Sequence, residues 1–513
     1  MNRIIRQLTP IVIIAAAPFA SASDWLQLAG GAQHRGHGTA APGEMSATIW
    51  IANQDSTSAS LVFEGPSSPV VFDGRVYANA RVYSGSNHVA NRIVAIDAAT
   101  GAILFETPIM RVSQNSWSSP AVDSQHRRIL IGSGNRVYAI DADSGHIDWE
   151  TPLLRNIVNA SVVVTDDAGI GRAFITDFDG AGTDGSLYCI NTDAFDGIAN
   201  PYLPGEIVWR EPIGGTSGNS PAYLDGVVYV SSVTDPASPG FPGIGHLYAF
   251  NAGAADGQRL VWSVGVSEGF FGGVTVANGF VYAASYNSFG GANNSTLVKV
   301  RAADGVIQWT TACERSDSIP IVDGDRIYLS AGIPGFGSTP KVQAFVDHGT
   351  SASKVWDTYA DTNGSLVVGG WTHQPILADG ILYCGRIPSG NVFFGAYTEM
   401  FMLNVGVSPN DASFVIDHRA GFGSSPAISD GRLYSIGPDG LHAIAMLGDV
   451  CGGADNPVYA ADGTVDGADI QCFVELLLSV DPSSARIAIA DFDGDGTLTA
   501  SDAALFADFL IGQ

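Results

Sequence analysis

The stretch RVYAIDADSGHIDWE, from Arg136 to Glu150, contains the unit from which most of this chain is built. An apolar run leads into a polar turn that ends in glycine, and a second run follows with an aromatic residue, Trp149. RIVAIDAATGAILFE, from Arg92, and LVKVRAADGVIQW, from Leu297, repeat the same order of features. Alternating apolar residues on both sides of a glycine turn predict two antiparallel strands in each copy.

A second pair of strands precedes each of these copies. SPVVFDGRVY begins at Ser68, SPAYLDGVVY at Ser220 and SPAISDGRLY at Ser425, and looser copies begin at Gly273 and Ile319. Asp-Gly and Asn-Gly dipeptides favour tight hairpin turns because both residues tolerate a positive φ. Such hairpins recur eight times, 44 to 55 residues apart. Four strands per repeat predict an all-β fold, an eight-bladed β-propeller of four-stranded blades.

The eighth repeat ends near Met446, one strand short of a complete blade. Near the N-terminus, ATIWIANQ (residues 47–54) has strand-like alternation and an aromatic residue, Trp50. We expect this segment to supply the missing outer strand, because closing the ring removes two exposed sheet edges.

The repeats resemble the quinoprotein-type repeat, named for pyrroloquinoline quinone (PQQ), over roughly Trp25 to Leu447. PQQ dehydrogenases of this architecture have an adjacent cysteine pair, a catalytic aspartate and calcium ligands, and many have a Cys-x-x-Cys-His haem motif. This sequence contains neither adjacent cysteines nor that motif. The repeats resemble equally well the non-catalytic propellers of the family, such as the outer-membrane assembly lipoprotein. We therefore do not expect bound PQQ.

One face of the predicted propeller is elaborated. Long segments such as ARVYSGSNHVAN (residues 80–91) and GRIPSGNVFFGAY (residues 385–397) join the second and third strands of their blades, and QNSWSS and GGWTHQ join blades. Aromatic residues on one rim suit binding of a glycan or a protein, although they can equally pack the loops against one another. The ligand-face candidates are Trp117, Trp371, Tyr83, Tyr286 and Phe336.

The chain ends in sequence of another kind, DFDGDGTLTASD, which runs from Asp491 to Asp502. Its spacing is that of a twelve-residue EF-hand loop, with glycine at position six for the sharp turn. Carboxylates this close repel one another unless a cation lies among them, so the sequence predicts a calcium site. The predicted ligands, from position one to position twelve, are Asp491, Asp493, Asp495, Thr497, Thr499 and Asp502.

A second, less regular loop lies upstream, and an apolar helical run follows each loop. The two loops resemble a type I dockerin module over residues 448–513, which implies a cohesin domain as partner. The further calcium ligands would be Asp449, Asp462, Thr464, Asp466 and Asp469. Counting back from Asp469 puts Val458 and Ala460 at positions one and three, so an insertion after "GDV" would leave either Asp449 alone or Asp449 together with Asp455 to substitute. Cys451 and Cys472 flank this loop and could form a disulfide in an oxidising compartment.

The first 22 residues have the features of a secretory signal: Arg3 and Arg6, an apolar run, and a small-x-small site at residues 20–22. We expect a signal peptide at 1–22, the propeller at 23–447 and the calcium module at 448–513. The protein would be secreted, to the cell surface, the medium or the periplasm. A net charge of -27 argues against nucleic acid and anionic membranes as partners, and no apolar run is long enough for membrane insertion.

Two function classes are compatible with the sequence. The first is a non-enzymatic propeller that binds a ligand or protein partner and is tethered by its dockerin-like tail. The second is a secreted enzyme, active on polysaccharide or an atypical quinoprotein, that the tail docks into a complex. Absence of the expected redox motifs favours the first class.

Overall fold

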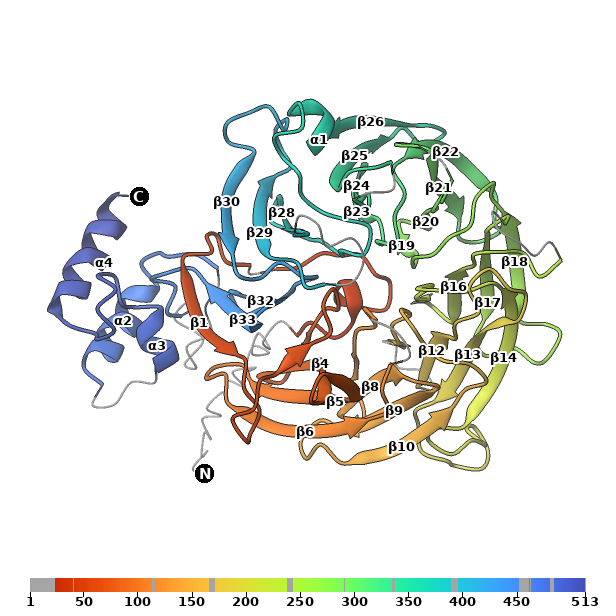
Figure 1. Cartoon of the computed structure of the whole chain (residues 1–513), viewed down its shortest axis with the longest axis horizontal. Helices are drawn as coiled ribbons and strands as arrows, with labels where there is room; N and C mark the ends of the chain where they lie inside the picture. Colours follow the sequence, from red (N-terminus) through yellow and green to blue (C-terminus); the bar gives the residue numbers. More distant parts are fainter. Residues whose placement is uncertain are drawn as a thin grey trace, which may run out of the picture.

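The computed structural model describes residues 24–39, 41–112, 116–165, 171–237, 243–289, 291–334, 337–388, 395–451, 461, 463–479 and 484–512. Eight antiparallel sheets form a closed ring around a central axis (Figure 1). The predicted eight-bladed propeller of four-stranded blades is confirmed. The first blade carries one extra short strand, β2 (Val62–Phe63), which pairs with β4.

The strands of each blade follow one another from the axis outward, except that β1 is the outermost strand of the eighth blade. The first blade consists of β3 (Val70–Phe72), β4 (Arg75–Ser84), β5 (Asn87–Asp97) and β6 (Ile103–Ile109), the second of β7 (Ala121–Asp123), β8 (Arg128–Ser133), β9 (Arg136–Asp141) and β10 (Ile147–Pro152), and the third of β11 (Val163–Val164), β12 (Arg172–Thr176), β13 (Gly185–Asn191) and β14 (Ile207–Gly214). The fourth blade consists of β15 (Ala222–Leu224), β16 (Val227–Ser231), β17 (His246–Asn251) and β18 (Leu260–Gly265), the fifth of β19 (Thr275–Ala277), β20 (Phe280–Ala284), β21 (Ser295–Arg301) and β22 (Ile307–Cys313), and the sixth of β23 (Ile321–Asp323), β24 (Arg326–Ala331), β25 (Lys341–Asp347) and β26 (Ala352–Asp357). The seventh blade consists of β27 (Ile376–Ala378), β28 (Ile381–Arg386), β29 (Glu399–Asn404) and β30 (Val415–Ala420), and the eighth of β31 (Ala427–Ser429), β32 (Arg432–Gly437), β33 (Gly440–Ala445) and β1 (Ala47–Ala52).

The outer aromatic residue of a blade holds the next blade in place. Trp262 on β18 donates a hydrogen bond from Nε1 to the carbonyl oxygen of Ala302, at 2.8 Å, in the next blade. Its ring lies against Gly305, where a Cβ atom would come within 2.8 Å of the indole, so the glycine of the polar turn is required by this packing. Trp209 makes the equivalent bond to Ala252 at 2.9 Å.

The same contact closes the ring. Strand β1 pairs antiparallel with β33 as the outermost strand of the eighth blade, as the sequence predicted. Trp50 on β1 donates from Nε1 to the carbonyl oxygen of Ala98 in the first blade, at 3.0 Å, and packs on Gly101. An N-terminal strand thus makes the inter-blade contact that an eighth outer strand would make, and no sheet edge is left open there.

A segment that the sequence analysis did not single out runs around the inside of the ring. Residues 24–39, here called the N-terminal strap, contain a 3-10 turn, η1 (Leu28–Gly30), and lie within the ring in Figure 1. The strap hydrogen-bonds the innermost strand of seven successive blades, through Trp25 to Val71, Leu26 to Val122, Gln27 to Val164, Ala32 to Tyr223, Gln33 to Val276, His37 to Val322 and Gly36 to Leu377. It therefore lines the channel of the propeller with backbone from a single short segment.

Apart from a short helix α1 (Thr358–Asp361) after β26, the helices belong to the C-terminal part of the chain. Helices α2 (Asp469–Leu477), α3 (Ser484–Ala488) and α4 (Ala500–Gly512) lie outside the ring beside β1 (Figure 1). Phe473 on α2 stacks on Phe506 of α4, with ring centroids 4.2 Å apart. Within the described residues, no helix has the length and apolar character needed to span a membrane.

Candidate functional site

The residue two positions before each innermost strand forms a ring around the axis, here called the axial ring. Its members are Ser68, Ser119, Ser161, Ser220, Gly273, Ile319, Gln374 and Ser425. Along two arcs of this ring, the backbone N–H of one member donates to the side-chain oxygen of the next. Ser68 donates to Ser119, Ser119 to Ser161 and Ser161 to Ser220, each at 2.9 Å. Ile319 donates to Gln374 at 2.8 Å, and Gln374 to Ser425 at 3.0 Å.

The axial ring is interrupted between the fourth and sixth blades. Gly273 has no side chain, and Ile319 has no oxygen to accept a bond. The Ser220 N–H instead donates to the Gly218 carbonyl at 2.7 Å. A Cβ atom at Gly273 would lie only 2.7 Å from the Ser220 carbonyl oxygen, so the backbones of neighbouring blades approach closely where the hydroxyl is missing.

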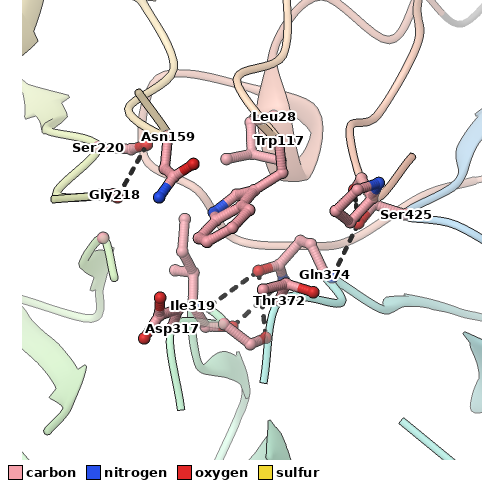
Figure 2. Close-up of a pocket in the computed structure, with 13 residues that line it drawn as sticks. Leu28, Trp117, Asn159, Gly218, Ser220, Asp317, Ile319, Thr372, Gln374 and Ser425 are labelled. Carbon is pink, nitrogen blue, oxygen red and sulfur yellow. Dashed lines mark hydrogen bonds between the residues drawn. The ribbon is translucent and has the colours of Figure 1, made fainter. Parts of the chain in front are cut away.

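A small cavity lies at the axis beside this interruption (Figure 2). All eight blades contribute to its wall, and Leu28 of the N-terminal strap contributes as well. The space open to the centres of water molecules is about 20 Å³. That volume suits one water molecule or one small ionic group.

Asp317 lines this cavity and is 7% exposed. Its backbone N–H donates to the Trp371 carbonyl oxygen at 2.8 Å, but neither carboxylate oxygen has a hydrogen-bond partner among the described residues. Burial raises the pKa of Asp317 well above its usual range. Asn159, which also lines the cavity, has a buried side-chain oxygen that meets no partner in the described part of the chain. In folded proteins a buried polar atom without a partner is uncommon and calls for an explanation.

Three of the five predicted ligand-face residues meet near this cavity. Trp117 lies 5.4 Å from Trp371 between ring centroids, in an edge-on arrangement, and Tyr286 lies 5.8 Å from Trp371. Phe271 extends this aromatic cluster, 5.0 Å from Tyr286. Trp117 also forms part of the cavity wall (Figure 2). The inter-blade segments therefore place side chains at the axis from blades far apart in the sequence.

The other two ligand-face residues are placed differently. Tyr83 is 42% exposed and lies against His88, 5.6 Å between ring centroids. The segment predicted as a loop around it is an extension of the β4–β5 hairpin: the two strands stay paired as far as Ser84, with a shift of register between Val82 and Tyr83. Phe336 lies outside the described residues.

The residues that sequence reasoning missed are Asp317 and Asn159. Each stands two residues before a member of the axial ring, on segments without a recognisable motif. The signal in the sequence was indirect: the copies at Gly273 and Ile319 lack the serine that begins most of the other hairpins. Only the structure shows that this departure leaves a cavity and an unpaired carboxylate.

In the C-terminal part, the second predicted loop has the geometry of a cation site. Asp491, Asp493 and Asp502 each offer a carboxylate oxygen, and these oxygens lie within 4.8 Å of one another. The N–H of Gly496 donates to Asp491 at 2.8 Å, and the N–H groups of Asp493 and Thr499 donate to Asp502 at 3.2 and 2.7 Å.

Two effects oppose each other at Asp502. Burial disfavours its ionised form, but hydrogen bonds from the Thr499 and Asp493 backbones and the Thr499 hydroxyl outweigh burial and lower its pKa. The side chain of Asp495 forms hydrogen bonds within the loop: it accepts from the N–H and the hydroxyl of Thr497, at 2.8 and 2.6 Å. Backbone and hydroxyl donors thus preorganise the loop around its carboxylates and favour the ionised form of Asp502.

The first loop repeats this bonding pattern, which fixes its numbering. Gly463 donates to Asp449 at 2.7 Å as Gly496 does to Asp491. Cys451 and Asp466 donate to Asp469, both at 2.9 Å, as Asp493 and Thr499 do to Asp502. The structure therefore places Asp449 at position one and Cys451 at position three, not Val458 and Ala460. Asp462 falls outside the described residues, and Thr464 is exposed.

Position three of the first loop differs in its chemistry. Cys451 forms a disulfide with Cys472 on α2, with the two Cα atoms 6.1 Å apart. A sulfur in a disulfide offers no charge and is a poor ligand for calcium, which prefers oxygen. The chain thus has a covalent link where the second loop has the carboxylate of Asp493. The remaining cysteines, Cys189, Cys313 and Cys384, are buried and free.

Helix α2 exposes large apolar side chains on one face. Ile470 is 48% exposed, Val474 46% and Leu478, the C-terminal capping residue of the helix, 76%. Residues spaced by four lie on the same face of a helix, so these three form one apolar stripe. The opposite face packs inward through Phe473 and Leu476. An apolar stripe on a surface helix is typical of a partner-binding site.

Two family models match the sequence. The model described as "Outer membrane protein assembly factor BamB" matches residues 46–175 and 243–394, more than half of the chain. The model of the dockerin type I domain matches residues 460–510. No curated protein matches the chain.

Solved structures of low sequence identity share the propeller fold. The quinohemoprotein alcohol dehydrogenase of Comamonas testosteroni is 12% identical, with 94% of this chain and 96% of that chain covered and a TM-score of 0.54. The quinohemoprotein alcohol dehydrogenase ADHIIG of Pseudomonas putida HK5 is also 12% identical, with coverages of 80% and 75% and a TM-score of 0.50. A europium-containing methanol dehydrogenase is 10% identical, with coverages of 82% and 89% and a TM-score of 0.50. These likenesses show the fold alone.

Proposed function

The chain belongs to the repeat family of the outer membrane protein assembly factor BamB, and from that premise we propose that its propeller is a non-enzymatic recognition domain. A calcium-dependent dockerin module tethers this domain to a cohesin-type partner. The match to the dockerin type I domain implies such a partner, and dockerin-containing proteins act outside the cell or at its surface. We therefore propose that the protein is secreted, and the disulfide of Cys451 suits an oxidising compartment.

One observation carries the tethering role: the apolar stripe of α2 is exposed directly beyond the first loop. Its three side chains do not contribute to the packing of α2 on α4, which uses Phe473. The module lies outside the ring (Figure 1), so a partner could reach the stripe without crossing the propeller face. An exposed apolar stripe of this kind supplies the buried centre that a stable protein interface needs.

Binding of a partner through this interface would depend on calcium. Twelve acidic residues and one basic residue lie between residues 449 and 513, a net charge of -11 that opposes compaction of the module. An ion held by Asp491, Asp493 and Asp502 would fix the start of α4, because Asp502 is in its first turn. Since α4 packs on α2, the ion would stabilise the helix that carries the stripe.

The size of the axial cavity supports a propeller without quinone chemistry. Pockets that hold drug-sized or cofactor-sized ligands are typically about 300 to 1,000 Å³. The axial cavity is far smaller, at about 20 Å³, and Leu28 of the N-terminal strap forms part of its wall. The three free cysteines lie on strands of the third, fifth and seventh blades and are not adjacent in sequence. An enzyme docked through the same tail remains the alternative. The likeness to alcohol dehydrogenases supports the shared fold alone.

The tethering role is tested with the calcium-saturated full chain and purified cohesin domains of several types. Val474→Glu places a charge in the apolar stripe and should weaken cohesin binding by about 30-fold or more, as expected for a hot-spot residue. Val89→Glu is the matched control, because Val89 is 50% exposed on β5 of the propeller. Binding of no cohesin type, or equal binding by Val474→Glu and the control, would contradict the proposal.

A further inference from the structure

We infer that the axial cavity binds a primary alkylammonium group, with the carboxylate of Asp317 as its anionic acceptor. This inference rests on the proposed function, because it names the ligand chemistry of the recognition face. The ligand would be the end of an amine-bearing chain, either a small amine or a lysine side chain.

The hydrogen-bonding capacity of the cavity is one-sided. Asp317 and Asn159 both line it, and three of their buried oxygen atoms, Oδ1 and Oδ2 of Asp317 and Oδ1 of Asn159, have no hydrogen-bond donor in the part of the chain that the structure describes. An ammonium group brings three N–H donors and no acceptor, which complements this set. A hydroxyl group would bring a single donor and leave two of the acceptors unsatisfied.

The site has an anionic side chain but no cationic partner for it among the described residues. Among the described residues, Asp317 forms no salt bridge with any cationic side chain. The nearby Arg315 is held elsewhere, with its guanidinium 5.8 Å from the Tyr286 ring centroid and Nε 3.8 Å from Glu314. Lys341 is likewise held by Glu314, at 3.4 Å. A ligand cation would therefore give Asp317 the counter-charge that the protein does not provide.

The size and the wall of the cavity favour an alkylammonium over other cations. A space of about 20 Å³ accepts a –NH₃⁺ head but is too small for a planar guanidinium with its five donors. Calcium needs six to eight oxygen ligands, twice the number that is unpaired here. The Trp117 ring forms part of the wall, and an indole attracts an alkylammonium through its π face.

Binding of a cation should be linked to the release of a proton. Burial raises the pKa of Asp317, and a cation in the cavity favours the ionised carboxylate, so binding should displace any proton that the carboxyl holds. Burial and the neighbouring Asp317 raise the pKa of Tyr286 to about 12, and burial also raises the pKa of Tyr397. Both tyrosines stay neutral, and Arg315 and Glu314 are paired with each other, so the released proton comes from Asp317.

The experiment titrates the full chain, with its calcium module saturated, with n-butylammonium chloride by calorimetry and tryptophan fluorescence. We expect saturable binding at one site. The release of a proton should appear as a difference between the binding enthalpies measured in two buffers of different ionisation enthalpy. n-Butanol, which has the same length without the charge, should not bind. Asp317→Asn should weaken amine binding by at least about tenfold, and Trp117→Leu by about fivefold. Asp325→Asn, on an exposed turn of the same blade, should leave binding unchanged.

A structural role for Asp317 would give a different result. Because the carboxyl has no partner, Asp317→Asn should melt at the same or a higher temperature than the wild type, whereas a structural aspartate would lower it. Equal binding of butanol and butylammonium, or no amine binding, would overturn the inference. The inference would also be overturned if calcium caused a fluorescence change that is lost in Asp317→Asn and kept in Asp325→Asn. Cohesin capture of the same preparations tests the tether separately, so the inference can fail while the proposed function stands.

Discussion

At the scale of single residues, burial decides the protonation state of His373, which lies in the seventh blade next to the axial cavity. Its ring is fully buried and accepts a hydrogen bond at Nε2 from the N–H of Gly385, at 2.8 Å. Nε2 therefore carries no proton, and burial lowers the pKa of His373 to about 3 from an ordinary value of 6.5. A protonated ring would lose this bond and place an unpaired charge in the core.

We predict that His373 makes the fold sensitive to acid. A histidine with a lowered pKa in the folded state contributes its full stability above its unfolded pKa of 6.5 and loses it as the pH falls toward about 3. In that window the wild type should lose up to roughly 1.4 kcal/mol per pH unit through this residue. His373→Gln keeps an acceptor for Gly385 without a titrating group. Urea unfolding at several pH values should show a shallower acid loss for the variant, and parallel pH profiles would contradict the prediction.

At the scale of elements, the N-terminal strap depends on one glycine. Gly36 has φ +69°, and a Cβ there would lie 2.7 Å from Cγ1 of Ile321 on the innermost strand of the sixth blade. Gly36→Ala should lower the free energy of unfolding by about 1 to 3 kcal/mol. Gly31→Ala is the matched control in the same segment, because no atom lies within 4 Å of its Cβ position and its backbone is extended. Equal melting temperatures for the two variants would show that the strap does not depend on the close packing of Gly36 against β23.

The two loops of the calcium module should differ in affinity. The second loop gathers three carboxylates, whereas the first has a disulfide sulfur at position three. Calorimetry of the full chain should therefore show one tight calcium site. Asp491→Asn should weaken it at least about tenfold, because calcium affinity follows the number of charged ligands. Asp449→Asn should change it less, and two tight sites of equal affinity would contradict this assignment.

At the scale of the whole molecule, closure of the ring rests on the contact of Trp50 with the first blade. Trp50 is 8% exposed and contacts both Ala98 and Gly101 across the closing interface. Trp50→Ala should cost about 3 to 5 kcal/mol in the free energy of unfolding, as for other large core truncations. Ile51→Ala, at a neighbouring residue that is 41% exposed on the same strand, should cost less than about 1 kcal/mol. Similar losses for both variants in urea unfolding would mean that another contact closes the ring.

The sequence revealed the features that repeat. Turn dipeptides such as Asp73-Gly74, both at positive φ, recur in register with the outer aromatic residues, so eight blades and the closing strand could be predicted. The N-terminal strap could not, because it has no period of its own and takes its shape from the strands that it touches. Asp317 could not either, since a sequence does not show which side chains lack a partner. The register of the first loop became clear only from the bonds of Asp449 and Asp469.

Release by a chelator tests the central claim most directly, namely that calcium holds this propeller on a cohesin-bearing partner. The full chain is captured on an immobilised cohesin domain in calcium, and the surface is then washed with a chelator. The geometry of Asp491, Asp493 and Asp502 predicts capture in calcium, complete release on chelation and recapture when calcium returns. Asp502→Asn should not be captured at calcium concentrations that suffice for the wild type. A chain that stays on the surface after chelation, or that binds equally well without calcium, would contradict the claim.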